Sequence, residues 1–267
     1  KILISFLILV DMKTKLIILG CGSSVGVPRI DGEWGRCKRT NKKNRRTRCS
    51  AIITRGSNSI LIDTSPDIKH QLLSNDIKEV SSVIFTHEHA DQTNGLFELR
   101  PFFWRYKKKI NVFGNSRTIN ELIKRYEYLF KKTGPYPPIV KANIVKNKFS
   151  LGNSNEKILF KTVSLRHGNT KTVAYIFEKT AYISDCNDFS ITKIKELHNL
   201  KYLILDCLKF AKHPSHFNLD ECLYIHNKLS PKKTILTNLH HDLDYNYLLK
   251  KLPKNIIPAF DGLKIDL

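Results

Sequence analysis

The chain has 267 residues, of which 41% are hydrophobic and 26% charged, a composition typical of a folded globular protein and unlike that of a disordered, collagen-like or coiled-coil chain. No apolar run reaches the ~20 residues that cross a bilayer, so the sequence excludes a membrane-spanning protein and we expect no membrane partner. The 45 lysines and arginines against 24 acidic residues give a net charge of +21, which attracts anions such as phosphate esters or nucleic acid, although AT-rich codon usage would produce the same excess.

The first twelve residues read as an extension in front of the domain. Residues 2–10 are mostly apolar, as in a signal peptide, but no small-residue cleavage site follows them. Met12 is the only methionine, so we expect translation to start there, with a signal anchor as the alternative. We therefore predict a 1–12 extension and a single domain over residues 13–267.

Short apolar runs alternate with helical patterns along the rest of the chain. Strands are predicted at residues 16–19, 50–54, 59–63, 82–86, 110–113, 158–164, 173–177, 182–184, 202–205, 234–237 and 262–265. Helices are predicted at residues 66–74, 92–99, 117–131, 190–197, 219–229 and 245–252. This alternation, without a linker, predicts an α/β domain in which helices cover two sheets, in four layers.

Cysteine usage favours a reducing compartment. The six cysteines form no CxxC pair and no compact framework. Their spacing argues against a disulfide-stapled domain or a zinc ribbon and predicts a cytoplasmic protein.

The segment after the strand at 82–86 predicts a metal site. His87, His89 and Asp91 alternate, and alternate side chains of an extended chain point the same way. Imidazole and carboxylate groups are standard ligands of zinc and similar divalent ions. More candidate ligands follow other apolar strands, where open sheets commonly bind ligands: Asp63, His167, Asp185 and His240.

This ordered set resembles the metallo-β-lactamase superfamily, with a strand-end aspartate, HxHxD, and then His, Asp and His. Residues 20–28 (GCGSSVGVP), 44–50 (NRRTRCS), 213–242 and 260–262 resemble its PhnP-like phosphoribosyl cyclic phosphodiesterase branch. The resemblance covers roughly residues 13–267. It implies a four-layer αββα sandwich and a metal-dependent hydrolase with one or two divalent ions, zinc or manganese.

The resemblance also implies roles for single residues. The first ion would be held by His87, His89 and His167. The second would be held by Asp91 and His240, with Asp185 bridging the two. Asp63 would orient the histidine loop without binding metal.

Two departures from the superfamily pattern affect the metals. The usual HxHxDH has glutamine at its last position here, Gln92, and this leaves three alternatives for the second ion: looser binding, manganese in preference to zinc, or absence. The N-terminal cysteine cluster of some PhnP-like members is reduced to Cys37, so we predict no structural zinc.

Phosphodiester hydrolysis needs an activated water, a proton for the leaving group and cationic contacts to the phosphate. Asp91 belongs with the catalytic residues, and His216 is the preferred general acid over His213, unless both only cap the following helix. For the phosphate we expect one or two of four arginines, and two serines of the glycine-rich turn: Arg45, Arg46, Arg48, Arg100, Ser23 and Ser24.

We expect a metal-dependent phosphodiesterase acting on a small cyclic ribose phosphate or cyclic nucleotide. The first alternative is an RNA-processing endonuclease of the tRNase Z kind, which the charge favours. The second is a non-catalytic nucleic-acid-binding protein whose metal site is decayed at Gln92. A homodimer is possible, because dimers are the commonest soluble assembly.

Overall fold

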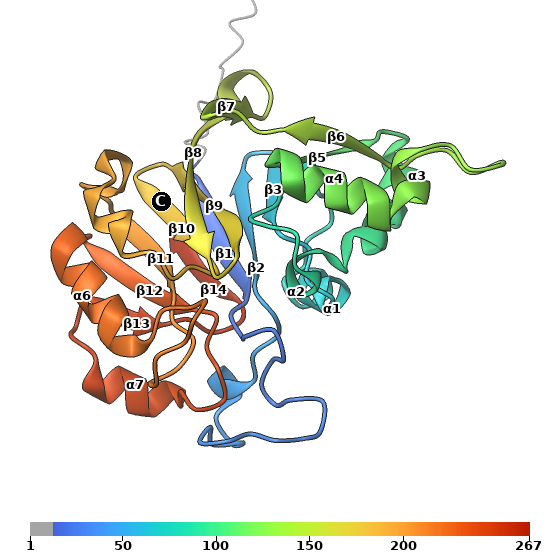
Figure 1. The fold of residues 1–267 in the computed structure, drawn as a ribbon. Helices are drawn as coiled ribbons and strands as arrows, with labels where there is room; N and C mark the ends of the chain where they lie inside the picture. The colour runs from blue at the N-terminus through green and yellow to red at the C-terminus, as the bar shows by residue number, and fades with distance from the viewer. Residues whose placement is uncertain (1–12) are drawn as a thin grey trace, which may run out of the picture.

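The computed structural model describes residues 13–267, so the predicted extension at 1–12 lies outside the described residues. Two seven-stranded sheets make up the centre of the molecule (Figure 1). The first has the order β14 (Leu263–Asp266), β1 (Lys15–Gly20), β2 (Ser50–Arg55), β3 (Asn58–Ile62), β4 (Ser82–Ile84), β5 (Ile110–Gly114) and β6 (Val140–Ile144). The second has the order β13 (Ile256–Pro258), β12 (Lys233–Thr237), β11 (Tyr202–Asp206), β10 (Thr180–Ile183), β9 (Thr170–Phe177), β8 (Ile158–His167) and β7 (Lys148–Leu151).

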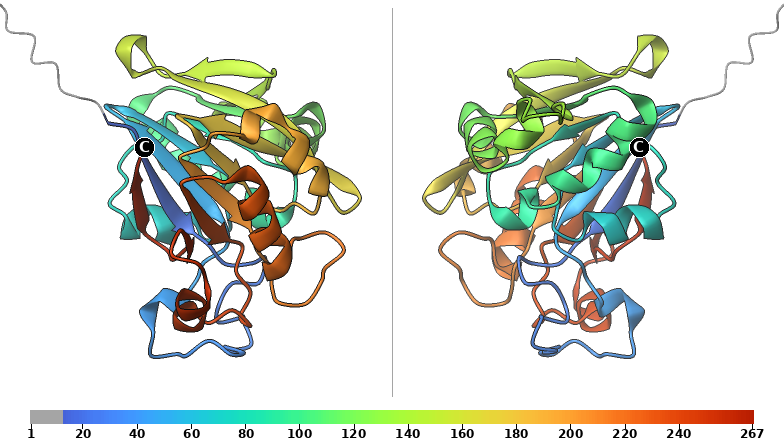
Figure 2. Two further views of the ribbon diagram at one scale, coloured as in Figure 1. Left: turned by 90° about the vertical axis from the view of Figure 1, so that its left-hand side faces the viewer. Right: turned by 90° about the vertical axis from the view of Figure 1, so that its right-hand side faces the viewer.

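Helices cover the outer face of each sheet, as the two side views of Figure 2 show. On the first sheet these are α1 (Ile68–Ser74), α3 (Arg100–Tyr106), α4 (Ser116–Arg125) and α5 (Glu127–Phe130). The short helix α2 (Ala90–Thr93) follows the histidines after β4. On the second sheet they are α6 (Leu219–Leu229) and α7 (Tyr245–Lys251). In residues 13–267, no helix combines the length and the hydropathy that a membrane crossing needs.

Three apolar layers hold the sandwich together. Alternate residues of β1 face opposite ways: Leu16 and Ile18 pack between the two sheets, whereas Ile17 and Leu19 pack under the helices of the first sheet. A third cluster joins the second sheet to α6. The predicted four-layer αββα architecture is therefore confirmed.

The parallel strands bring the candidate ligands to one edge. β3, β4 and β5 run parallel in the first sheet, and β10, β11 and β12 run parallel in the second. The carboxyl ends of parallel strands open on the same edge of a sheet. The turns that carry Asp63, His87, Asp185 and Asn238 follow four of these strands directly.

Candidate metal centre

Asp63 fixes the loop that carries the histidines. Its buried carboxylate accepts hydrogen bonds from the backbone N–H and the hydroxyl of Thr86, both at 2.8 Å. Since the Thr86 hydroxyl donates to Asp63, its lone pair is left to accept the Nδ1–H of His87, 3.0 Å away. The contacts therefore leave Nε2 of His87 without a proton, as a metal ligand must be.

His87 has the environment of a neutral imidazole. Its side chain is fully buried, and its Nε2 atom has no hydrogen-bond partner. Burial and the neighbouring imidazoles of His167 and His89 hold the pKa of His87 well below its ordinary value. A buried, unpartnered nitrogen is costly unless it has a ligand, so this atom points to an ion.

His167, the last residue of β8, is oriented in the same way. Its Nδ1 lies 2.7 Å from the backbone carbonyl of Ser215 and donates to it, which leaves Nε2 as the free lone pair. That Nε2 lies 3.2 Å from Nδ1 of His89. In the turn after β10, Asp185 places its Oδ2 3.7 Å from Nε2 of His87 and 3.8 Å from Nε2 of His167.

These four side chains fit a single divalent ion. One ligand atom from each of His87, His89, His167 and Asp185 lies within 4.8 Å of the others. Ligands about 2.0–2.1 Å from a tetrahedral zinc are about 3.4 Å apart, close to the separations of 3.2–3.8 Å found here. Three imidazoles and one carboxylate oxygen are a donor set that suits zinc.

Comparison with known proteins agrees with this geometry. Residues 58–240 match the family described as the β-lactamase superfamily domain. The chain belongs to the metallo-β-lactamase superfamily. A diphosphatase from the PhnP family, known from a crystal structure, has 30% sequence identity to this chain. The two structures match with a TM-score of 0.85, over 96% of this chain and 98% of that one. The resemblance to the PhnP-like branch is thereby confirmed.

Two solved structures of lower sequence identity are similar to this chain in fold alone. Zinc-bound PqqB from Methylobacterium extorquens is 15% identical, with a TM-score of 0.76, over 95% of this chain and all of that one. The short form of human tRNase Z is 15% identical, with a TM-score of 0.67, over 94% and 98% of the two chains.

One curated relative is a longer protein. An octanoyltransferase from Porphyromonas gingivalis is 29% identical over 255 residues, which are 94% of this chain and 51% of that protein. The chain thus spans about half the length of this relative, and the activity in its name does not carry over.

The four candidate metal ligands, His87, His89, His167 and Asp185, lie at a cleft of about 610 Å³. We call these four side chains the metal group. The walls of the cleft include Ser24, Asp91, Arg125 and His216. Burial and the nearby Asp185 raise the pKa of Asp91 to about 6. The cleft thus combines a metal group, a carboxylate and a cation within reach of one small ligand.

His216 is held by a buried carboxylate. Its Nδ1 lies 2.9 Å from Oδ2 of Asp206. Burial lowers the pKa of His216, but the Asp206 carboxylate outweighs burial and raises it to about 9. The other predicted candidate, His213, packs with its ring 5.1 Å from that of His216 and is not among the cleft-lining residues.

The four arginines predicted to bind phosphate do not line the cleft. Arg46 is buried, and its guanidinium donates to the backbone carbonyls of His240 and Leu243 at 3.2 and 2.7 Å, so it joins two loops. Arg48 is engaged by the Asp67 carboxylate through two hydrogen bonds of 2.8 and 2.7 Å.

The remaining predicted phosphate ligands divide between surface and cleft. Arg45 lies over the ring of Trp34, and Arg100 lies near the rings of Phe97 and Tyr128. Ser24 lines the cleft, whereas Ser23 is buried and its hydroxyl has no partner.

Three other arginines border the metal group and were missed in the sequence. Arg125 at the end of α4 lines the cleft, and Arg117 and Arg166 line an adjoining hollow of about 430 Å³ that shares His89 and His167 with it. Arg166 directly precedes the ligand His167, which is a signal that sequence reasoning could have used. The two arginines of α4 carry no such signal, because only the packing of α4 on β5 and β6 brings them to this edge.

His240 was expected to bind the second ion, but the structure places it elsewhere. It belongs to a separate group with His241 and Asp242, its ring 3.7 Å from that of His241. Strand β12 ends at Thr237, and the residue that turns toward Asp185 is Asn238, two positions before His240. Asn238 has a φ of 60°, a left-handed conformation that asparagine tolerates better than most residues.

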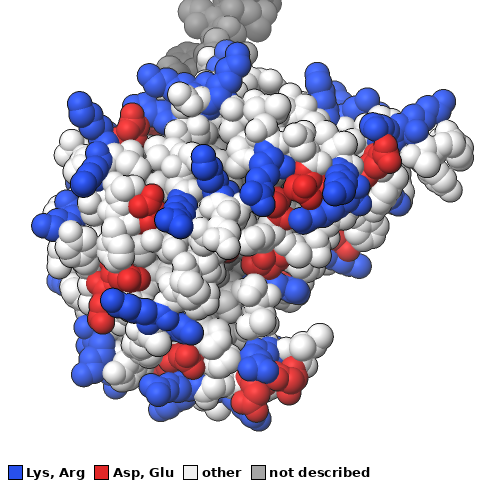
Figure 3. Space-filling view, in the orientation of Figure 1, with Lys and Arg blue, Asp and Glu red and all other residues white. Residues whose placement is uncertain are grey.

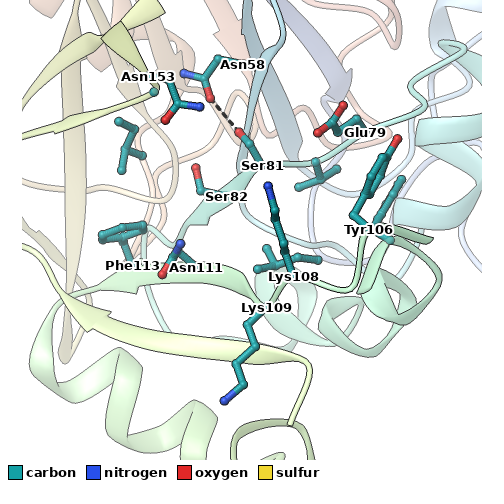
Figure 4. Close-up of a pocket in the computed structure, with 15 residues that line it drawn as sticks. Asn58, Glu79, Ser81, Ser82, Tyr106, Lys108, Lys109, Asn111, Phe113 and Asn153 are labelled. Atoms are coloured by element: carbon teal, nitrogen blue, oxygen red, sulfur yellow. Dashed lines mark hydrogen bonds between the residues drawn. The ribbon is translucent and has the colours of Figure 1, made fainter. Parts of the chain in front are cut away.

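A separate cavity lies at the opposite end of β4 and β5. It has a volume of about 350 Å³ and is lined by the starts of these strands and by Lys108, Tyr106 and Glu79 (Figure 4). A hydrogen bond of 2.7 Å from Ser81 to Asn58 crosses one wall. No histidine and a single carboxylate line it, so it lacks the donor set of the metal centre.

Proposed function

We propose that the protein is a metal-dependent phosphodiesterase that cleaves a small phosphodiester, a cyclic ribose phosphate or a cyclic nucleotide. The observation that carries this proposal is that three arginines from α4 and β8 border the four metal-binding side chains, Arg125 in the cleft and Arg117 and Arg166 in the adjoining hollow. Guanidinium groups match phosphate oxygens in charge and geometry. The PhnP-family relative is named a diphosphatase, which supports a phosphorus substrate.

The chain would supply four functions in this reaction. An ion held by His87, His89, His167 and Asp185 would supply Lewis acidity and lower the pKa of a water molecule. Arg125 would bind and orient the phosphate, and Asp91 would accept a proton from the attacking water. The Nδ1–H of His216 would donate to Asp206, whose carboxylate raises the pKa of His216 to about 9, so that Nε2 would also carry a proton to give to the leaving oxygen.

On one face of the molecule, the distribution of charge favours a small substrate over RNA. On the face shown in Figure 3, lysines and arginines are scattered and interspersed with acidic residues, with no continuous basic stripe. A track for a polynucleotide would need such a stripe. Cleavage of RNA, which the net charge of +21 and the shared fold of human tRNase Z support, is the second candidate.

The test is a hydrolysis screen on the full chain with added zinc or manganese. It includes bis(p-nitrophenyl) phosphate, a ribose cyclic phosphate, 2′,3′-cyclic nucleotides and a precursor tRNA. We expect turnover of a small phosphodiester, lost in His167→Ala and retained in Arg45→Ala, whose side chain lies outside the cleft. Cleavage of the precursor tRNA alone would establish the second candidate, and no turnover of any substrate would support a non-catalytic nucleic-acid-binding protein.

A further inference from the structure

Asp185 offers a metal only one of its two carboxylate oxygens. Its Oδ1 accepts a hydrogen bond of 2.7 Å from the Ser184 hydroxyl and one of 3.3 Å from the Asn238 carboxamide. Its Oδ2 faces His87 and His167. A carboxylate that bridges two ions through both of its oxygens needs one oxygen for each ion, and here Oδ1 is engaged by protein donors.

Asn238 points a donor, not a ligand, at the carboxylates. Its buried Nδ2 lies 2.9 Å from Oδ1 of Asp206 and 3.3 Å from Oδ1 of Asp185. The opposite amide orientation would place its oxygen against two carboxylate oxygens, so the contacts fix which atom faces them. An N–H group in this place repels a cation.

Gln92 acts on Asp91 in a similar way. It is fully buried, and its Nε2 lies 3.2 Å from Oδ2 of Asp91. A carboxamide oxygen is uncharged and a weaker ligand for zinc than an imidazole. The residue after HxHxD, usually histidine in the superfamily, is thus a hydrogen-bond donor to the neighbouring carboxylate here.

We infer that the metal centre of this chain binds one ion and that the carboxamides of Gln92 and Asn238 close the position of a second. The first position has three imidazole nitrogens and one carboxylate oxygen within 4.8 Å of one another, and Nε2 of His87 has no hydrogen-bond partner. Around the second position, one oxygen each of Asp91 and Asp185 is engaged by an amide N–H group. Asp91 is then free to act as a base and not as a metal ligand, a role that rests on the proposed function.

Metal stoichiometry tests this inference without an activity assay. Metal-free protein is titrated calorimetrically with zinc, and its metal content is measured by mass spectrometry after dialysis. We expect one ion per chain in the wild type and in Gln92→Ala, and loss of tight binding in His167→Ala. The double variant Gln92→His/Asn238→His should bind two ions.

Two results would overturn the inference. One is a wild type that binds two ions with similar affinity, and the other is a His167→Ala variant that still binds one ion as tightly as the wild type. If the double variant fails to fold, as judged by circular dichroism, the wild-type stoichiometry still decides. Because the readout is metal content, an absence of phosphodiesterase activity would refute the proposed function and leave this inference standing.

Discussion

Asp63 accepts two hydrogen bonds from Thr86, a residue 23 positions later in the chain, and thereby sets the tautomer of the next residue, His87. Changing Asp63 to alanine removes both acceptors and frees the Thr86 hydroxyl to donate to His87. We expect zinc affinity to fall by ~10–100-fold, the usual effect of removing a residue that orients a metal ligand. The measurement is a competitive titration against a chromogenic chelator.

The control for this prediction is Asp63→Asn. Asp63 has a φ of 61°, and asparagine tolerates this left-handed conformation and keeps one acceptor oxygen. We expect Asp63→Asn to retain more zinc affinity than Asp63→Ala. Equal affinities in the wild type and Asp63→Ala would show that the loop is held without this carboxylate.

The metal-binding strand ends were predictable because each combines an apolar run with a polar residue directly after it. That pattern indicates His87, His167 and Asp185, and the structure brings all three to one point. Strands β6, β7 and β13 and helix α3 were missed. β6 (VKANI) and β7 (KFSL) alternate apolar and polar residues over only five and four positions, and β13 has three residues, so each is too short a run to stand out in the sequence.

Other failures depend on contacts that a sequence does not contain. Arg45, Arg46 and Arg48 look alike in sequence, yet one lies over Trp34, one is buried among carbonyls and one is paired with Asp67. His240 was chosen as the nearest histidine after β12, but the turn at Asn238 directs another side chain to the metal centre. The helix predicted at 117–131 breaks at Tyr126, where φ is −125°.

Arg46 should stabilise the folded chain, because its guanidinium joins two loops and does not face the cleft. Arg46→Ala leaves the buried carbonyl of Leu243 without its donor, at about 1–3 kcal/mol, whereas the carbonyl of His240 keeps the backbone N–H of Leu243 as a donor at 3.1 Å. We expect the free energy of unfolding to fall by roughly 1–3 kcal/mol in urea denaturation. The neighbouring Arg45→Ala, at an exposed side chain, should change it by less than about 0.5 kcal/mol. Equal losses in the two variants would refute a structural role specific to Arg46.

Metal removal should destabilise the fold. Zinc at a hundredfold excess over its dissociation constant stabilises a protein by about 2.7 kcal/mol, or roughly 5–10 °C in Tm for a chain of this size. We expect a chelator to lower Tm by that amount and added zinc to restore it. His240→Ala should show the same shift, because His240 lies outside the four-residue group, and His167→Ala should show little. A full shift in His167→Ala would place the ion elsewhere.

The salt dependence of kcat/KM should separate a small substrate from RNA. A protein that neutralises 6–10 phosphates loses about 10³–10⁵ in affinity between 50 and 200 mM salt, because counterions are released. A small phosphodiester that contacts only the arginines of the cleft releases few counterions. We therefore expect its kcat/KM to fall by no more than about tenfold over that range of salt concentration. A steep loss on a small substrate would contradict this, as would faster turnover of precursor tRNA at low salt.

Arg125 is the cleft cation whose removal should be most informative. It lines the cleft beside Asp91 and is anchored by a hydrogen bond of 2.6 Å to the backbone carbonyl of Glu88. A hydrogen bond to a charged group contributes about 1.5–3 kcal/mol, so Arg125→Ala should lower kcat/KM by roughly 10–100-fold. The adjacent Lys124→Ala, at an exposed position of the same helix, should leave kcat/KM unchanged. Steady-state kinetics on the best small phosphodiester measure both, and an equal loss in the two variants would assign the effect to α4 as a whole instead of to the guanidinium in the cleft.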